Sequence, residues 1–464
     1  MALLSLCFST AILASGFVQD GQHSSSLDAY LDGLIHKHAM PSASVAIVKN
    51  GRVTYAKAFG YSDLENDVKA TPDSVYRLGS ITKQFTATMI MQLVNEGKLN
   101  IDQPIREILP GCPDTWMAVT TRNLLNHTSG IKSYTEISGI FADAAMKPTT
   151  PSGIIKTIEK SPLDFEPGTK WHYDNTGYEL LGMIIEKLDH LPFAVSLSKR
   201  ILKPLGMTHT YFTSEQNIVK HRAQGYSPVV GGFKHANYLN MSWPYAAGSM
   251  ESTVLDLAKW DAALYGSKLL PQDSLAKMWT PTTLKDGTTQ NYGFGWALAT
   301  VNGSKCVEHG GGIHGFTTYI KRAPQKGLTV ILLTNSDESD TNKIANDLMG
   351  IADPSLQVKA FQPIANNDTL TKLTREAITS MIDGTLNHKL LTPDFAKQVT
   401  PEIESSAKAD LGKLGKLTKM ELLSTKVDNG MTTREYRITI GVSELKMTIA
   451  ITKEGLIAGL RLSP

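Results

Sequence analysis

The sequence is poor in cysteine and in net charge, and each shortage excludes a class of protein. Only three cysteines occur in 464 residues, and Cys7 lies in an apolar run at the N-terminus. The other two, Cys112 and Cys306, are too few for a disulfide framework or a zinc site. The 46 basic and 44 acidic residues leave a net charge of +2, which provides no general attraction to nucleic acid or anionic membranes.

Motifs for metals and cofactors are also missing. The sequence has no H-E-x-x-H pattern, no Cys/His pair at metal-ligand spacing, no phosphate-binding loop and no dinucleotide fingerprint. We therefore predict neither a metal nor a cofactor. The expected partner is a small-molecule substrate and not a nucleic acid, and the sequence does not specify an oligomeric state.

Long apolar runs are absent apart from residues 1–18, MALLSLCFSTAILASGFV. This uncharged run, followed by small residues, predicts a secretory signal peptide with cleavage near Ala14 to Gly16, although no basic residue precedes it. The alternatives are a short membrane anchor or a wrongly assigned start. No other segment approaches the roughly 20 apolar residues of a spanning helix. We therefore expect a periplasmic or secreted protein without a membrane span in its mature form.

Core-forming residues, by contrast, are plentiful, with 41% hydrophobic and 19% charged residues. That composition and the length of the chain predict a large globular domain plus a small one. Turn-forming residues replace regular periodicity at 353–368, which we interpret as a linker. The predicted domains are therefore 25–352 and 369–464.

The first domain has an early hairpin and a group of late strands. Residues 42–49 and 52–60 flank Asn50-Gly51, the strongest short signal for a hairpin. Segments 305–311, 316–324 and 328–336 are typical of strands, and the chain between 80 and 280 is mainly helical. This order predicts an α+β fold, with one antiparallel sheet flanked by helices and interrupted by a large helical insert.

The second domain differs from the first in its pattern. Helical segments at 370–384 and 395–415 precede four predicted strands and their turns. The strands are expected at 419–427, 432–440, 445–451 and 456–462, with turns at 428–430 and 453–455. This small α+β unit distantly resembles cystatin-like and nuclear-transport-factor-like (NTF2-like) folds, and it contains no cluster of catalytic residue types.

The pattern Ser-x-x-Lys occurs six times, and context distinguishes one copy. Ser80 opens a helical stretch whose apolar residues recur at helical spacing and which ends at Gly97, whereas the other copies lack this setting. Lys83 would lie on the same helix face and could activate the serine if burial lowered its pKa. The alternative is a serine that only caps the helix. The other copies begin at Ser129, Ser196, Ser274, Ser405 and Ser443.

Two further motifs carry side chains suited to the same chemistry. Tyr173-Asp174-Asn175 precedes an amphipathic helix that could hold a phenol and an amide over a neighbouring site, or it could be a packed turn with a helix cap. Residues 238–240 repeat the Tyr-x-Asn pattern without such a helix. His309-Gly310-Gly311 lies on a predicted strand, where glycine lets a substrate backbone approach, or it is only a glycine-rich connection.

Taken in order, the three motifs resemble the serine β-lactamase and penicillin-binding protein superfamily, in particular its class C β-lactamase-like branch of esterases and D-peptidases. The usual signature has Ser-Asp-Asn and Lys-Thr-Gly as second and third motifs, so Tyr173 and His309 depart from it. The resemblance extends over residues 25–350. Family-like segments occur at 124–131, 166–182, 203–210, 247–260 and 291–296.

The resemblance implies a role for each motif residue. Ser80 would be the nucleophile, and Lys83 and Tyr173 would share the proton transfers, with the general base left open between them. Asn175 would bind the substrate amide. The strand with His309 and Gly311 would bind substrate, and the backbone N–H groups of Ser80 and Gly312 would form the oxyanion hole.

These residues predict a serine hydrolase that acts through an acyl-enzyme on small esters or amides. A neutral imidazole at His309 offers a substrate carboxylate less charge than lysine, which disfavours strong penicillinase activity. The alternatives are a D-alanyl-D-alanine carboxypeptidase, D-aminopeptidase or β-lactamase and, in another class, a penicillin-reactive sensor or scaffold. His127 is expected to be structural. His314 could face the cleft or pack, and so could Tyr292, Phe294 and Trp296.

Overall fold

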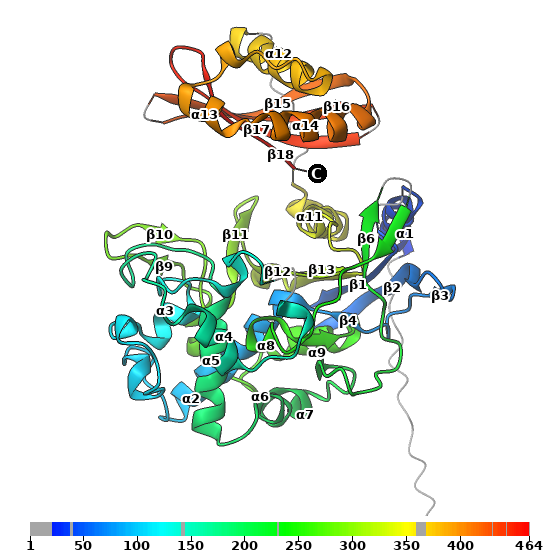
Figure 1. Ribbon diagram of the computed structural model, residues 1–464. Helices are drawn as coiled ribbons and strands as arrows, with labels where there is room; N and C mark the ends of the chain where they lie inside the picture. Colours follow the sequence, from blue (N-terminus) through cyan, green and yellow to red (C-terminus); the bar gives the residue numbers. More distant parts are fainter. Residues whose placement is uncertain are drawn as a thin grey trace, which may run out of the picture. The chain divides into compact units, whose positions relative to one another are not determined.

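The computed structural model shows two compact units, which meet in the sequence between Val358 and Lys359 (Figure 1). It describes residues 21–37, 40–140, 144–229, 232–358, 368–428, 430–441 and 443–463. The N-terminal apolar run with its cleavage site and Cys7 lies outside the described residues. The boundary between the units falls inside the segment interpreted as a linker, of which 359–367 also lie outside them. None of the described helices combines the length and apolar character needed to cross a bilayer.

An antiparallel sheet of seven strands forms the centre of unit 1, as the sequence predicts. The strands lie in the order β11-β12-β13-β14-β1-β2-β3. Asn50 and Gly51 have φ angles of 51° and 72°, which is the left-handed conformation that a tight β1–β2 turn requires. The strands are β1 (Ser42–Lys49), β2 (Arg52–Asp63), β3 (Val68–Lys69), β11 (Ala297–Val301), β12 (Ser304–Ile313), β13 (Phe316–Ala323) and β14 (Leu328–Thr334).

Helices cover both faces of this sheet, so its central strands are apolar on both sides. Val45 and Ile47 of β1 face a core that they share with α1 (Gly21–His36) and α11 (Thr341–Ala352). Their neighbours Ala46 and Val48 point to the opposite face, into the larger core of the helical insert. The two-residue period of a strand explains this division.

The helical insert contributes α2, α5 and α8, which pack against one another in unit 1. Its helices are α2 (Thr82–Asn95), α3 (Thr121–Leu125), α4 (Pro151–Ile158), α5 (Asn175–Asp189), α6 (Phe193–Leu197), α7 (Lys203–Leu205), α8 (Tyr245–Gly248), α9 (Val254–Ala263) and α10 (Gln272–Met278). Short strands accompany them: β4 (Tyr76–Arg77), β5 (Tyr211–Phe212), β6 (Tyr226–Val229), β7 (Gly232–His235), β8 (Met250–Ser252), β9 (Thr282–Thr283) and β10 (Thr289–Gln290).

Unit 2 is a four-stranded meander with helices packed on one face. Buried residues alternate along β16, where Tyr436, Ile438 and Ile440 face Ile378 and Leu411 of the helices. The elements are α12 (Thr369–Asp383), α13 (Pro393–Gln398), α14 (Pro401–Leu414), β15 (Leu417–Asp428), β16 (Met431–Ile440), β17 (Ser443–Ile451) and β18 (Ile457–Ser463). The predicted α+β class is confirmed, and the likeness to cystatin-like or nuclear-transport-factor-like folds stays a prediction.

Candidate active site

Ser80 lies in a short 3-10 turn, Gly79–Ile81, that leads directly into α2. The regular helix therefore begins two residues after the serine. Gly79 has a φ of 54°, and a side chain there would come within 2.9 Å of the backbone nitrogen of Gly312. Glycine is needed at this position because the turn requires a positive φ and a close approach to β12. Ser80 is thereby held against the strand of the third motif.

Lys83 is the second residue of α2 and is fully buried, and its side-chain nitrogen has three partners. Nζ lies 3.0 Å from Ser80 Oγ, 2.8 Å from Asn175 Oδ1 and 2.9 Å from the carbonyl oxygen of Ala247. Two of these atoms can only accept a hydrogen bond, whereas the serine hydroxyl can donate one. A neutral amine has two N–H donors and one lone pair, so it fits this set of partners with Ser80 as the donor.

The charge state of Lys83 is set mainly by its burial. Desolvation lowers the pKa of the lysine to about 7, while Glu179 and Asp174 act in the opposite direction. A substantial fraction of Lys83 is therefore neutral near pH 7. In that state the amine can accept the proton of Ser80.

The Tyr173-Asp174-Asn175 motif lies at the start of α5, and its side chains reach Lys83 and Ser80. The ring centre of Tyr173 lies 4.9 Å from Lys83 Nζ. Burial raises the pKa of the phenol above its usual value, against a hydrogen bond with Ser80 that lowers it. Asn175 accepts from Lys83 and donates through Nδ2 to Thr135 Oγ1 at 3.2 Å. The first two motifs are therefore in direct contact.

His127 and Ser129 hold this motif in place from the preceding loop. The backbone N–H of Asp174 donates to His127 Nδ1 at 3.1 Å, and Ser129 Oγ donates to Asp174 Oδ2 at 3.0 Å. The imidazole of His127 also lies 4.3 Å from the ring of Tyr173, centre to centre. His127 is thus structural, and it positions the site, which its sequence context did not indicate. Burial raises the pKa of Asp174 to about 7.

His309 of the third motif is buried, and both of its ring nitrogens are occupied. Its Nε2 lies 2.9 Å from the hydroxyl of Tyr292 and its Nδ1 lies 2.6 Å from the carbonyl oxygen of Gly310. Because a carbonyl only accepts, Nδ1 carries the proton and Nε2 accepts from Tyr292. Burial and the charge of Lys83 lower the pKa of His309 to about 4, so the ring is neutral at pH 7.

The glycines of the third motif bring β12 against the serine turn. A Cβ on Gly311 would lie 1.9 Å from the carbonyl oxygen of Leu78 and 2.3 Å from Thr318 Oγ1. Gly312, by contrast, borders open space and lines a cavity together with Ser80. The glycine run 310–312 therefore combines a glycine needed for packing, Gly311, with one that faces the cavity, Gly312.

The cavity next to Ser80 has a volume of about 180 Å³ and a mostly apolar lining. Its lining contains no lysine or arginine, and His314 is its one imidazole among the described residues. Of the rival motif at 238–240, Leu239 lines the cavity while Tyr238 is 49% exposed. Phe294 and Trp296 belong to the main core. The lining consists of Gly79, Ser80, Tyr134, Thr135, Asn175, Leu239, Pro244, Ala247, Gly248, Gly312, Ile313 and His314.

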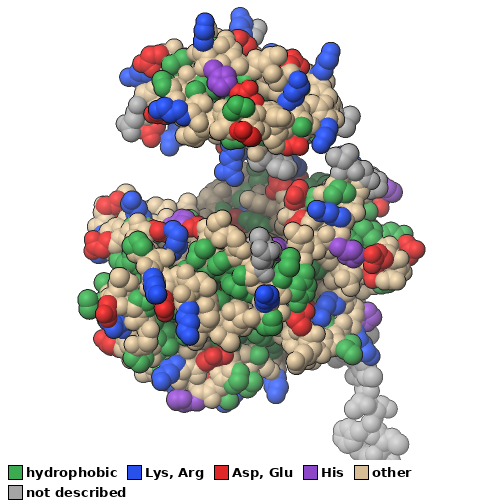
Figure 2. Space-filling view, in the orientation of Figure 1, with side chains coloured by type: hydrophobic (Ala, Val, Ile, Leu, Met, Phe, Trp, Pro, Cys, Tyr) green, Lys and Arg blue, Asp and Glu red, His purple; other side chains and the backbone are tan. Residues whose placement is uncertain are grey.

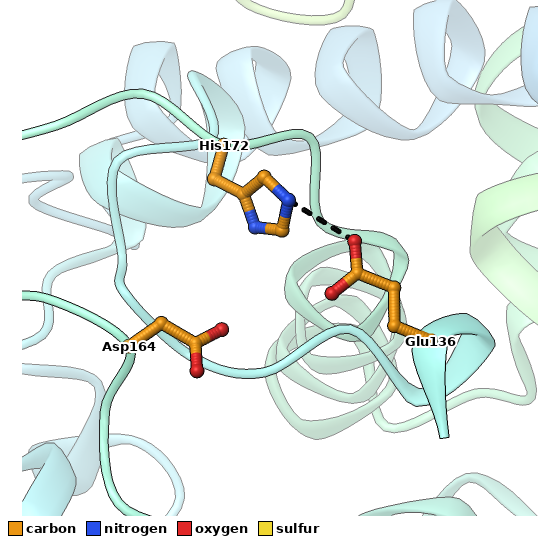
Figure 3. A group of neighbouring side chains, drawn as sticks. All are labelled: Glu136, Asp164 and His172. Atoms are coloured by element: carbon orange, nitrogen blue, oxygen red, sulfur yellow. Dashed lines mark ion pairs between the residues drawn. The ribbon is translucent and has the colours of Figure 1, made fainter. Parts of the chain in front are cut away.

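A group of potential metal ligands, Glu136, Asp164 and His172, lies beside the Tyr173-Asp174-Asn175 motif (Figure 3). His172 Nε2 pairs with Glu136 at 3.0 Å, and Lys132 pairs with Asp164 at 3.3 Å. His172 and Glu136 are thus already paired with each other, and Lys132 places a competing cation beside Asp164. We assign the His172–Glu136 pair to fixing the segment next to Tyr173, and we assign no metal to the group.

Comparison with known proteins agrees with this geometry. A family model described as Beta-lactamase matches residues 27–353. Penicillin-binding protein 4* of Bacillus subtilis (strain 168) is 30% identical over 395 residues, which are 82% of this chain and 85% of that protein. The putative penicillin-binding protein PbpX of the same strain is 34% identical over 259 residues, 56% of this chain; the match spans 62% of PbpX, less than two thirds of its length.

A solved structure extends the comparison to an amidase. The D-amino acid amidase of Ochrobactrum anthropi SV3, complexed with L-phenylalanine amide, has a TM-score of 0.62 and 29% identity, covering 73% of this chain and 97% of the amidase. The fold and the arrangement of motifs define a hydrolase fold of the penicillin-recognising serine class. The chain belongs to the Beta-lactamase family, whose model covers most of it.

Proposed function

We propose that the protein is a serine hydrolase that cleaves small, uncharged esters or amides through an acyl-enzyme on Ser80. The observation that carries this proposal is the set of partners around Lys83. Two of them are hydrogen-bond acceptors and the third is the hydroxyl of Ser80, in a buried setting that favours the neutral amine. Such a lysine is suited to activating a serine.

In the proposed mechanism, Lys83 takes the proton of Ser80 as Oγ attacks the substrate carbonyl carbon. The oxyanion that forms would be stabilised by the backbone N–H groups of Ser80 and Gly312. The proton then passes from Lys83 through the phenol of Tyr173 to the leaving oxygen or nitrogen. Water cleaves the resulting ester by the reverse route, releasing the acid and returning the proton to Ser80. The two pKa directions favour Lys83 as base and Tyr173 as proton donor.

Two features support uncharged substrates. The cavity lining contains no lysine or arginine, and His309 is neutral with both nitrogens occupied. A carboxylate, as in a penicillin or a free peptide C-terminus, would therefore lack a cation to pair with its charge. The similarity to an amidase adds support for amides. Peptide substrates remain the second candidate, because two relatives carry penicillin-binding names.

The test compares the purified full chain with Ser80→Ala on four substrates: a p-nitrophenyl ester, a D-amino acid amide, a D-alanyl-D-alanine peptide and a chromogenic cephalosporin. We expect turnover of the ester or amide to exceed that of the two carboxylate substrates. The substitution should lower kcat/KM by roughly 1,000-fold or more. Undiminished turnover in Ser80→Ala would overturn the proposal, and stable acylation without turnover would favour a sensor.

The proposed location is outside the cytoplasm, periplasmic or secreted. This part of the proposal rests on the uncharged apolar run of residues 1–18 and on the penicillin-binding names of two relatives. N-terminal sequencing of protein from the native host would test it, since removal of the run near Ala14 to Gly16 is expected.

A further inference from the structure

Glu179 is a buried carboxyl group that the proposed mechanism does not use. It lies on α5 four residues after Asn175, so both side chains project from the same helix face. Its side chain is completely buried, and neither carboxyl oxygen has a hydrogen-bond partner of good geometry among the described residues. A buried carboxylate in such a place is costly unless an opposite charge lies close by.

The opposite charge is that of Lys83, on the other side of the Ala247 backbone. Lys83 Nζ donates to the carbonyl oxygen of Ala247 at 2.9 Å. Burial raises the pKa of Glu179 well above its usual value, while the charge of Lys83 and, less strongly, the backbone N–H of Ala247 favour the carboxylate. Helix α5 packs against both α2 and α8, which carry Lys83 and Ala247. The two ionisable groups therefore lie on either side of the backbone of Ala247.

We propose that Glu179 is a positioning residue that faces Lys83 across the Ala247 backbone and sets the pH at which the lysine can activate Ser80. The proposal rests on the proposed function, because it concerns the proton that Lys83 must lose before Ser80 attacks. Glu179 does not touch the reacting atoms. It acts by stabilising the protonated form of the lysine.

Among the described groups around Lys83, two carboxyl groups can stabilise its protonated form. Asp174, at the start of α5, acts on Lys83 in the same direction as Glu179 but has a smaller effect. The rings of Tyr173 and Tyr178 lie 4.9 Å and 5.3 Å from Nζ. Burial raises the pKa of both phenols, so these tyrosines are uncharged at neutral pH.

The remaining titratable neighbours are also neutral. Burial lowers the pKa of His127 and of His309, and the charge of Lys83 acts on both in the same direction. On the side of Glu179 lie Tyr134 and Tyr245. Burial raises the pKa of both, helped by Glu179 at Tyr134 and by Glu186 and then Glu179 at Tyr245. Among the described residues, Glu179 thus has the largest effect on the pKa of Lys83 in opposition to desolvation.

Removing the charge of Glu179 should change the pKa of Lys83 in a defined direction. Glu179 raises the pKa of Lys83, so Glu179→Gln should lower it further. The neutral amine would then persist at lower pH, and the acid limb of kcat/KM should move toward lower pH. A shift of about one pH unit corresponds to roughly tenfold more activity on the acid limb, relative to each enzyme's own plateau.

The experiment measures kcat/KM from pH 4.5 to 9 for the full-length wild type, Glu179→Gln, Glu179→Asp and Glu107→Gln on a p-nitrophenyl ester. Glu179→Gln should shift the acid limb downward. Glu179→Asp keeps the carboxylate and should stay close to wild type, and Glu107→Gln removes an exposed carboxylate from the same unit and should not shift it. Tryptophan fluorescence confirms that each variant is folded.

An acid limb that stays in place or moves to higher pH in Glu179→Gln would overturn the inference. Should that variant not fold, Glu179→Leu provides the same test, because it also removes the charge. Activity that is lost in Ser80→Ala but unshifted in Glu179→Gln would refute only the role of Glu179. Activity that survives in Ser80→Ala would refute the proposed function itself.

Discussion

The two units bury different kinds of residue. Unit 1 buries Lys83, Glu179, Asp174, His127 and His309 near one another, next to Ser80. Unit 2 buries an almost wholly apolar set under its sheet, and Arg434 is its one buried charged residue among those described. Burial of ionisable groups is costly and persists where it serves a site, so the contrast locates chemistry in unit 1.

Burial alone does not identify the site, because unit 1 also buries ion pairs elsewhere. Arg322 and Asp261 are completely buried but contact each other directly, as do Lys321 and Glu308. Lys83 instead contacts uncharged oxygens, and the carboxyl groups that influence it, those of Glu179 and Asp174, lie beyond these contacts. The outer surfaces differ little: in the view of Figure 2, basic and acidic side chains are interspersed on both units. The distinguishing feature is a buried lysine that, among the described residues, has no direct anionic partner.

The contact between β12 and the serine turn is where a single methyl group should have the largest effect. Gly311→Ala would place Cβ 1.9 Å from the carbonyl oxygen of Leu78, and backbone cannot move aside cheaply. Displacing Ser80 by about 1 Å should lower kcat/KM by roughly 100-fold or more. Overpacking should also lower the free energy of unfolding by about 1–3 kcal/mol.

Gly312→Ala is the matched control, since a Cβ there meets no atom within 4 Å. It should leave the stability of unit 1 unchanged. Tryptophan fluorescence is a selective probe, because all six tryptophans lie between Trp116 and Trp296 and therefore in unit 1. Equal denaturation midpoints for wild type and Gly311→Ala would contradict the close packing.

Much of this arrangement follows from sequence patterns that have a physical cause. Asn50-Gly51 predicts the β1–β2 hairpin because both residues adopt positive φ, and the alternation in β16 identifies its buried face. The apolar period predicts the helix after Ser80, yet the regular helix starts only at Thr82. Boundaries shift because the serine turn adapts to β12, a contact between residues more than 200 positions apart.

The contacts within the site were only partly predictable. Ser80, Lys83, Tyr173 and Asn175 belong to recognisable motifs, and the structure places them together. Ala247 was not identified, because it acts through a backbone carbonyl, which any residue type supplies. Glu179 could have been noticed as a charged residue on the apolar face of α5, four positions after Asn175. Its proximity to Lys83 could not be predicted, because α2 and α5 are far apart in the sequence.

His309 provides a test of intermediate size, on stability. Its pKa falls from 6.5 to about 4 on folding, so the unfolded chain binds a proton more readily. The stability that this group contributes is therefore present above pH 6.5 and is lost as the pH falls toward 4. The loss amounts to at most about 3 kcal/mol. His309→Gln should remove this part of the acid destabilisation.

The measurement is urea denaturation of wild type and His309→Gln at pH 7.5 and 4.5, followed by tryptophan fluorescence. The wild type should lose about 2–3 kcal/mol more than the variant between the two pH values. An identical loss in both proteins would show that His309 is free to protonate in the folded state. The cleft would then accept a positive charge, and the argument against carboxylate substrates would fail.

The smallest effect on catalysis is expected from the one buried charge of unit 2. Arg434 on β16 binds Asp368 through two hydrogen bonds, of 2.7 Å and 2.5 Å, and donates to Thr371 at 3.1 Å. Asp368 in turn caps α12, so the arginine fastens this helix to the sheet. Arg434→Met removes the bond while keeping much of the side-chain volume. Because Asp368 is 40% exposed, water can take over part of its hydrogen bonding.

We therefore expect Arg434→Met to destabilise unit 2 by about 1–3 kcal/mol, less than the loss of a fully buried pair. Hydrogen exchange in β15–β18 should accelerate, while the tryptophan transition and kcat/KM on a small ester stay within twofold of wild type. A directly paired charge in unit 2 would then serve stability alone, in contrast to Lys83. A larger loss of kcat/KM would mean that unit 2 supports the cleft, and the difference in buried residues would no longer separate a catalytic unit from a structural one.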